Sequence, residues 1–340
     1  MTASRPIKII GGGLAGLSLG LALRRAGIAV TIIEAGNYPR HRVCGEFITG
    51  LRRSTRERLG LDPFLEGAAP NREVGWFIRG VPARTQRLPA IAFGLSRHTL
   101  DTRLARAFVE AGGHLRVNTR SASFNDAPGR IIATGRRRSA SRWLGLKLHA
   151  LDFPLKSELE LHLGDDAYIG LTRIEDHRVN ICGLFRLREI AAKGKDLLLA
   201  YLDACRLDTL SRRLAHAALD DASFCAVAAV DFDRHVGSSK EVRLGDTLAM
   251  IPPFTGHGMA MAFQSAEVAL APLIAYARGD EDWPHTRQVI HRTLRRRFRV
   301  RLASAGALHS FLLQPSRQRL LGALNRARLL PLGPLYAALH

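Results

Sequence analysis

The chain has 340 residues, of which 46% are hydrophobic and 24% charged, a composition typical of a folded globular protein. This length allows a sizeable hydrophobic core, which excludes a small disulfide-stapled protein. Fifty basic residues against thirty acidic residues give a formal net charge of +20, and most of the basic residues are arginine. The excess charge predicts attraction to anionic small molecules, membrane surfaces or nucleic acid, without choosing among them.

The four cysteines and thirteen histidines show no ligand spacing of a metal site. Cys44, Cys182, Cys205 and Cys225 stand far apart without a CxxC pair, and no HExxH segment is present. We therefore expect reduced thiols, a cytoplasmic protein and no bound metal.

The first 34 residues have the pattern of a βαβ unit. Residues 6–10 (PIKII) predict a buried strand, residues 14–27 an apolar helix, and residues 28–34 (IAVTIIE) a second strand. Four glycines interrupt the apolar run, so we interpret it as a folded unit and not as a secretory signal.

The turn between the first strand and the helix carries a GxGxxG motif. Gly11 permits the tight turn, Gly13 lets the backbone approach a diphosphate, and Gly16 lets the helix pack closely on the strand. Leu14 and Ala15 begin the helix, whose positive end would face the diphosphate. The motif predicts a dinucleotide site.

Glu34 ends the second strand, 18 residues after Gly16, and Ala35 follows it. This is close to the offset at which an acidic side chain accepts hydrogen bonds from the ribose of a dinucleotide. The unit alone leaves FAD and NAD open.

Three later segments carry a family resemblance. These are residues 37–48 (NYPRHRVCGEFI), 95–108 (LSRHTLDTRLARAF) and 243–269 (RLGDTLAMIPPFTGHGMAMAFQSAEVA). With the N-terminal motif they resemble the FAD-dependent oxidoreductases of the para-hydroxybenzoate hydroxylase fold, and the motifs are most similar to the geranylgeranyl reductase-like branch.

The resemblance implies a set of FAD-binding residues beyond the N-terminal motif. Arg42, Cys44 and Gly45 would lie beside the flavin, Arg97 would contact the cofactor, and Asp246 would bind the ribityl chain. The remaining expected contacts are Gly245, Pro253, Gly256, His257, Gly258 and Met259. A carboxylate suits a polyol because it only accepts hydrogen bonds.

The chain also departs from the pattern of its hydroxylase relatives. Gly135 and Arg136 stand at the places of a DG pair that handles flavin and pyridine nucleotide, and no second GxGxxG is present. NADH or NADPH is therefore expected only as a transient electron donor. The halogenase WxWxIP signature is also absent.

The resemblance implies an α/β fold with a discontinuous Rossmann-like FAD-binding domain, an antiparallel substrate-binding sheet and a helical tail. We expect the FAD-binding domain at 1–70, 92–150 and 226–283, the sheet at 71–91 and 151–225, and the tail at 284–340. In the tail, apolar residues recur every four positions between arginines, which predicts a basic amphipathic helix. The helix would pack on the cofactor domain, contact a membrane surface or cover the substrate site as a lid.

These patterns favour an FAD-dependent monooxygenase acting on a hydrophobic, polyketide-like or lipid-like small molecule. An ene-reductase of the geranylgeranyl reductase type is the alternative, and a basic nucleic-acid or membrane-surface protein with a degenerate dinucleotide fold is a third hypothesis. His257 and Cys44 are the candidate catalytic residues for proton delivery. The positive charge would favour an anionic or carrier-bound substrate, and no specific nucleic acid is expected.

Overall fold

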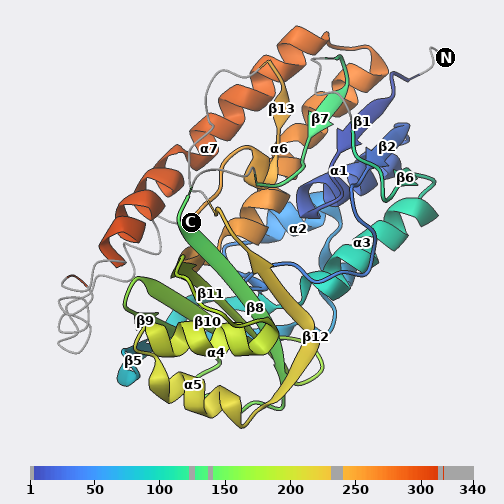
Figure 1. Ribbon diagram of the computed structural model, residues 1–340. Helices are drawn as coiled ribbons and strands as arrows, with labels where there is room; N and C mark the ends of the chain where they lie inside the picture. The colour runs from blue at the N-terminus through green and yellow to red at the C-terminus, as the bar shows by residue number, and fades with distance from the viewer. Residues whose placement is uncertain (1–3, 122–126, 137–140, 231–239, 313–316, 318–340) are drawn as a thin grey trace.

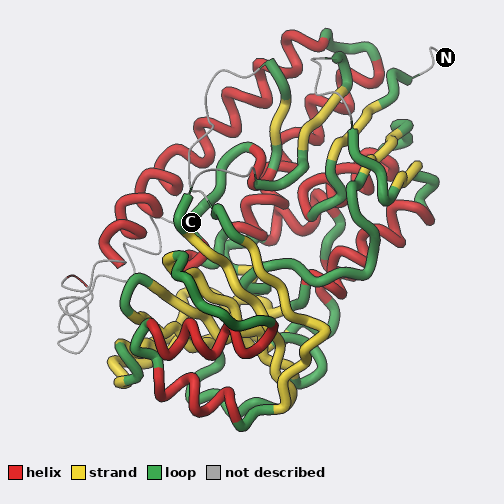
Figure 2. Tube along the Cα trace, in the orientation of Figure 1, coloured by secondary structure: helices red, strands yellow, loops and turns green. Residues whose placement is uncertain are grey.

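The computed structural model describes residues 4–121, 127–136, 141–230, 240–312 and 317. Two β-sheets form its framework, with helices packed on both (Figures 1 and 2). The elements of the first sheet and its helices are β1 (Ile7–Ile10), α1 (Leu14–Arg25), β2 (Val30–Ile33), α2 (Arg53–Leu59), η1 (Asp62–Leu65), α3 (Arg97–Glu110), β6 (His114–Arg116), β7 (Arg130–Ile132), β13 (Val242–Arg243), η2 (Gly245–Thr247), η3 (Pro253–Thr255), α6 (Gly258–Arg278) and α7 (Trp283–Leu312). Those of the second are β3 (Phe47–Ile48), β4 (Ala69–Ile78), β5 (Val81–Gly94), β8 (Trp143–Leu151), β9 (Leu159–Gly164), β10 (Ala167–Arg173), β11 (Arg178–Arg186), α4 (Gly194–Ala204), α5 (Asp208–Ala215) and β12 (Ala218–Val227).

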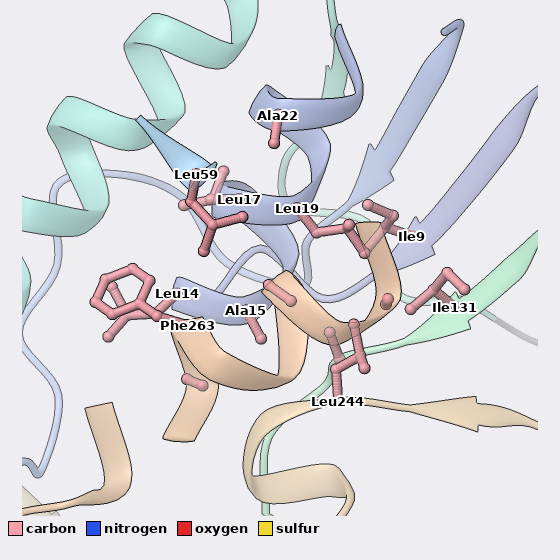
Figure 3. Packing of buried hydrophobic residues seen from close by; sticks show 14 of the residues in the cluster. Ile9, Leu14, Ala15, Leu17, Leu19, Ala22, Leu59, Ile131, Leu244 and Phe263 are labelled. Carbon is pink, nitrogen blue, oxygen red and sulfur yellow. The ribbon is translucent and has the colours of Figure 1, made fainter. Parts of the chain in front are cut away.

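The first sheet has five strands in the order β13-β7-β1-β2-β6, and every neighbouring pair is parallel. The predicted βαβ unit is confirmed as β1, α1 and β2. Its strands are apolar because helices cover a parallel sheet on its faces. Figure 3 shows Leu14 and Ala15 of α1 beside Phe263 of α6, in the core that joins these helices to Ile9 of β1.

The second sheet has eight strands in the order β12-β8-β11-β10-β9-β4-β5-β3. Its strands come from two separated segments of the chain, and β3 (Phe47–Ile48) lies in the range that was expected for the FAD-binding domain. The pairing is antiparallel except between β4 and β9, which run parallel. This parallel pair joins the two segments, so the expectation of a purely antiparallel sheet is wrong at that junction.

The two faces of this sheet have different partners. On β8, Leu144, Leu146 and Leu148 pack in the core that α4 and α5 complete. Side chains alternate along a strand, so Lys147 and His149 lie on the opposite face, toward the FAD-binding half of the chain. The alternation of β8 therefore sorts apolar side chains to the helices and polar ones to the inner face.

Strand β8 also corrects one expected domain boundary. The cofactor domain was expected to extend to 150, but β8 begins at Trp143 and pairs with β11 and β12 of the large sheet. The period-2 alternation of WLGLKLHAL is that of a half-buried sheet strand. In addition, α4 and α5 lie within the segment 151–225, for which only strands were expected.

Helices α6 and α7 lie together along the first sheet's side of the molecule (Figure 1). By length and composition α6 could cross a membrane, but most of it is buried in this core, as core helices of folded domains are. On α7, Ile290, Leu294, Phe298 and Leu302 are all buried in the same core. The tail helix thus packs on the cofactor domain, and the rest of the expected segment 284–340, after 312, lies outside the described residues apart from Arg317.

Candidate cofactor and substrate site

The GxGxxG turn forms a backbone cradle that admits no side chain. Gly11 has a φ of 111°, and a Cβ at this position would lie 2.2 Å from the carbonyl oxygen of Ala133. A Cβ on Gly16 would lie 2.0 Å from the carbonyl oxygen of Gly11. Gly13 is the N-cap of α1, and Leu14 and Ala15 form the first turn. The structure brings these residues together at one turn, and their contact with a diphosphate remains a prediction.

Glu34 lies at the end of β2, beside the cradle. Its carboxylate accepts from the backbone N–H of Gly12 at 2.6 Å and of Gly36 at 3.0 Å, and from Arg40 Nη2 at 2.8 Å. Burial alone would raise the pKa of Glu34, but the two backbone hydrogen bonds and the nearby arginines lower it below its usual value. Ala35, which follows it, is exposed.

Arg97 and Arg42 share one buried carboxylate. Arg97 Nε and Nη2 donate to Asp101 at 2.7 and 2.8 Å, and Arg42 Nε donates to the same carboxylate at 3.1 Å. Arg97 Nη2 lies 3.8 Å from the position of a Cβ on Gly13, so the guanidinium stands next to the cradle. Asp101 received no role from the sequence, although it stands four residues after Arg97, the helical spacing of an ion pair.

Asp246 lies in η2, where Gly245 brings the backbone against α1. The Cβ position of Gly245 is 3.3 Å from Cβ of Ala15. The Asp246 side chain is open to a cavity inside the protein. Enclosure by the protein raises the pKa of this carboxyl above its usual value. Arg97, Arg136 and Arg42 offset only part of that rise.

The segment from Pro253 to Met259 turns into the N-terminus of α6. Gly256 has a φ of 69°, and a Cβ there would lie 2.6 Å from the ring of Phe47. His257 is the N-cap of α6, is 2% exposed and borders the cavity. The helix end therefore faces the cavity.

The cavity has a volume of about 430 Å³ and is mostly apolar. It lies where the loop after β2, the inner face of the large sheet and the segment before α6 meet. Its wall includes Cys44, Gly45 and Asp246, together with the sheet residues Leu161, Leu163, Tyr168, Cys182 and Leu184. Leu308 of α7 closes one side. The sheet residues and Leu308 were not predicted, because their convergence depends on contacts between segments far apart in the sequence.

Cys44 and His257 both border this cavity, but Cys44 lies in a loop and His257 at a helix N-terminus. Burial raises the pKa of the Cys44 thiol, with a smaller opposing effect from Arg97. A raised pKa disfavours the thiolate, so at neutral pH Cys44 is a weak acid beside the cavity. His257 is held at the helix terminus, with its carbonyl oxygen accepting from the N–H of Met261 at 2.8 Å. A catalytic role of either remains a prediction.

Comparison with known proteins supports this assignment of the N-terminal half. Residues 5–139 match the family model described as "FAD binding domain". The chain carries an FAD-binding domain. The expected cofactor, FAD, is thereby confirmed.

Relatives of this FAD-binding protein include an enzyme and several solved structures. Menaquinone reductase from Mycolicibacterium smegmatis is 24% identical over 145 residues, which cover 39% of this chain and 34% of that protein. The match therefore spans about a third of the curated relative's length.

Solved structures match over nearly the whole chain. The geranylgeranyl bacteriochlorophyll reductase-like protein of Thermoplasma acidophilum has a TM-score of 0.76 at 14% identity, covering 99% of this chain and 96% of its own. PqsL from Pseudomonas aeruginosa, a probable FAD-dependent monooxygenase solved in complex with 2-aminobenzoylacetate, has a TM-score of 0.70 at 15% identity, with coverage of 92% and 97%. At these identities the structures establish the fold, and the expected para-hydroxybenzoate hydroxylase fold is confirmed.

Within the described residues, no group of three or more His, Cys, Asp or Glu side chains could hold a metal ion. Of the DG-equivalent positions, Gly135 exchanges hydrogen bonds with the Thr247 hydroxyl, its N–H donating at 2.9 Å and its carbonyl oxygen accepting at 3.0 Å. Arg136 borders the cavity near Asp246.

Proposed function

We propose that the protein is an FAD-dependent oxidoreductase acting on a small apolar molecule. The observation that carries this proposal is the cavity. It adjoins Asp246 and the N-terminus of α6 on one side and the apolar inner face of the large sheet on the other. The bound flavin supplies the two-electron chemistry, while the protein positions it and limits access of water.

The residues present fit this cofactor. The lack of room for a Cβ at Gly11 and Gly16 fits the tight turn and close helix packing of a dinucleotide-binding unit, and Gly13 leaves the backbone open to a diphosphate. A carboxylate offers about four acceptor sites, and Glu34 uses three of them, for Gly12, Gly36 and Arg40. One site therefore remains for a ribose hydroxyl. Asp246, open to the cavity, would accept from the ribityl hydroxyls.

FAD uptake tests this proposal directly. The purified protein should be yellow or should take up added FAD, measured by flavin absorbance and fluorescence quenching. Asp246→Ala should weaken FAD binding about tenfold or more because it removes a charge-assisted acceptor. Asp196→Ala, on the exposed side of α4, is the matched control and should bind FAD like the wild type. A colourless wild type that takes up no FAD would instead favour the basic binding protein.

Within this class we propose a monooxygenase, with PqsL as the supporting fold neighbour. The ene-reductase stays as the second candidate because the curated relative and another neighbour have reductase names. Anaerobic reduction by NADH or NADPH followed by oxygen or substrate separates the two. Hydroxylated product that forms only with oxygen supports the monooxygenase. Substrate-driven reoxidation without oxygen supports the reductase.

We further propose that the substrate carries an anionic or carrier-linked group. Arg87 is exposed at the cavity wall and could receive such a group, while the apolar sheet residues would hold the rest. Arg87→Gln should raise KM with little change in kcat, and rising salt should raise the wild-type KM. An unchanged KM in both experiments would contradict an anionic substrate.

Peripheral membrane contact through α7 is a separate proposal. Arg292, Arg295, Arg296 and Arg299 are exposed on the helix, whose apolar face is buried in the core. Any membrane contact of this face would therefore be electrostatic. Co-sedimentation with anionic vesicles that disappears with neutral vesicles or in high salt would support it.

A further inference from the structure

A cluster of titratable side chains lies between the cavity wall and the protein surface. Glu46, Lys147 and His149 are each 0% exposed, whereas His41 and His98 are half-buried. Glu46 follows Cys44 and Gly45 in the loop that borders the cavity. Lys147 and His149 project from β8 onto the same inner face of the sheet. The cluster therefore joins a cavity-lining loop to residues that water can reach.

The distances within the cluster form a connected series. His41 Nδ1 lies 3.1 Å from Lys147 Nζ, and Lys147 Nζ lies 3.8 Å from Glu46 Oε1. The other carboxylate oxygen, Oε2, lies 2.6 Å from His149 Nε2. The rings of His41 and His98 stack with centroids 4.6 Å apart. The distance from Lys147 Nζ to Glu46 Oε1 is about 1 Å longer than a hydrogen bond. A small rotation of the lysine side chain would bring the two atoms within hydrogen-bond distance.

Hydrogen bonds that involve the backbone hold the three buried members of the cluster in place. The N–H of Arg97 donates to Glu46 Oε1 at 2.9 Å, and Lys147 Nζ lies 3.4 Å from the carbonyl oxygen of Ser223. The N–H of His149 donates to the Ser223 hydroxyl at 2.7 Å. Burying an ammonium and a carboxylate carries a large desolvation cost, and hydrophobic side chains of similar volume often replace such pairs without loss of stability. The cluster thus calls for a role beyond packing.

We propose that His41, Lys147 and Glu46 form a proton path between solvent and the cavity, with Glu46 at its inner end. This inference rests on the proposed FAD-dependent activity. Two-electron redox change of a flavin is accompanied by proton exchange, and the apolar wall limits water inside the cavity. Side chains that link solvent to the inner end of the cavity would supply this proton without opening the apolar wall to water.

The proton balance of the path is simple. An N–H bond of the Lys147 ammonium breaks as an O–H bond forms on Glu46, and Glu46 then gives that proton to the cavity. The neutral amine takes a proton from Nδ1 of His41, while the other ring nitrogen takes one from water. The imidazole stays neutral throughout and regains its first tautomer by exchange with water. His149 Nε2–H donates to Glu46 and orients the carboxylate.

The charged and titratable groups around the path are compatible with this direction. His41 meets Lys147, His149, His98 and Glu46, and desolvation, followed by Lys147, lowers the pKa of His41 to about 4. At neutral pH His41 is therefore uncharged, and its Nδ1–H tautomer can pass a proton to the neutral lysine amine while Nε2 takes one from water.

The neighbouring thiols do not compete for the proton. Cys182 of β11 and Cys225 of β12 pair in register with Lys147, and Cys44 precedes Glu46 in its loop. Burial raises the pKa of all three thiols, so they stay protonated at neutral pH. Arg97 of α3 keeps its charge in the ion pair with Asp101.

The test uses the FAD-loaded protein, reduced chemically by two electrons and then mixed with oxygen. Anionic reduced FAD (FADH−), oxygen and one proton give oxidised FAD and hydrogen peroxide, so the rate can be followed without the natural substrate. Glu46→Gln and Lys147→Met should slow reoxidation at neutral pH by about tenfold or more, within the range of general acid–base effects. Both should also change the pH profile and the solvent deuterium isotope effect. His41→Ala should slow it less, and added imidazole should restore the rate.

Glu160→Gln is the matched control, because Glu160 is an equally buried carboxylate paired to a histidine on the other face of the same sheet. It should leave the rate, pH profile and isotope effect unchanged. The midpoint potential and FAD affinity should stay at wild-type values in all path variants, since a path alters rates and not equilibria. Wild-type rates and isotope effects in Glu46→Gln, or His41→Ala slowed without imidazole rescue, would overturn the path alone. Shifted potentials or weakened FAD binding in the variants would overturn it in favour of a structural or electrostatic role. A wild type that takes up no FAD would overturn the proposed function, and the path with it.

Discussion

Two buried glutamate–histidine pairs lie on opposite faces of the large sheet. On the inner face, Glu46 contacts His149 and lies next to Lys147. On the outer face, Glu160 lies 2.8 Å from His162 Nε2 and 2.9 Å from Arg213 Nη1 of α5. Both carboxylates are fully buried and both have a basic partner. They use the same chemistry in two different surroundings.

The surroundings determine what each pair can do. Glu160 holds α5 against the sheet and also accepts from the N–H of Lys156 at 2.5 Å, with His162 stacked on Phe77 at 4.4 Å. Neither Glu160 nor His162 borders the cavity. Glu46 does border the cavity, because it lies in the loop after β2 next to Cys44 and Gly45. The comparison teaches that a buried ion pair is a functional candidate only when its position gives it access to a reacting group.

The largest expected effect comes from removing the outer carboxylate. Glu160→Ala should lower the free energy of unfolding by about 4 kcal/mol, because it leaves His162 and Arg213 without their buried partner. Urea unfolding followed by circular dichroism measures this loss, and FAD affinity should be unchanged. A weakened FAD affinity would break the distinction between the two pairs.

The second-largest expected effect is the loss of the stabilisation by Glu160 at low pH. Its hydrogen bonds to His162 and Arg213 outweigh burial and lower the pKa of Glu160 to about 2. The folded-state pKa is depressed, so the stabilisation is fully present above the unfolded value near 4.5 and is lost as pH falls toward 2. The linkage amounts to about 3 kcal/mol. Between pH 6 and 2, the unfolding free energy of Glu160→Gln should fall by about 3 kcal/mol less than that of the wild type.

Removing only the arginine should have a smaller effect. Arg213→Met keeps Glu160 bonded to His162 but loses the guanidinium, which also lies 4.9 Å from the ring of Phe153. We expect a loss of about 2 kcal/mol in the free energy of unfolding. The same urea titration checks it, and a loss equal to that of Glu160→Ala would mean that His162 contributes nothing to the pair.

The smallest effect is expected at the solvent end of the inner cluster. His98→Ala removes a half-exposed ring stacked on His41 and should cost less than about 1 kcal/mol. Because His98 is one of the groups that lower the pKa of His41, that pKa should rise from about 4 toward its usual value. NMR titration of the His41 ring measures it, and an unchanged pKa would show that the two rings do not interact electrically.

Much of the cofactor half could be predicted because its signals are local. The demand for glycine comes from a φ of 111° at Gly11 and from a backbone approach within one βαβ unit at Gly16, and Glu34 follows from the end of a strand. Asp101 could have been found from its four-residue spacing to Arg97 on one helix. The alternation in WLGLKLHAL could have predicted that the second segment of the large sheet begins at Trp143 and not at residue 151.

The inner cluster could be predicted only in part. Lys147 and His149 carry a sequence signal, since two basic side chains occupy one face of an otherwise apolar strand. Their partners carry none, because Glu46 and His41 stand about a hundred residues away and meet them only through strand pairing. The cavity walls are undetermined for the same reason.

The sequence by itself determined the dinucleotide cradle, the alternation of the sheet strands and the two faces of α7, because each depends on residue spacing within one element. Tertiary structure decided which acid meets which base. It placed Glu46 next to Lys147 beside the cavity and Glu160 next to Arg213 of α5. Long-range pairing of the strands sets the neighbours of each buried charge.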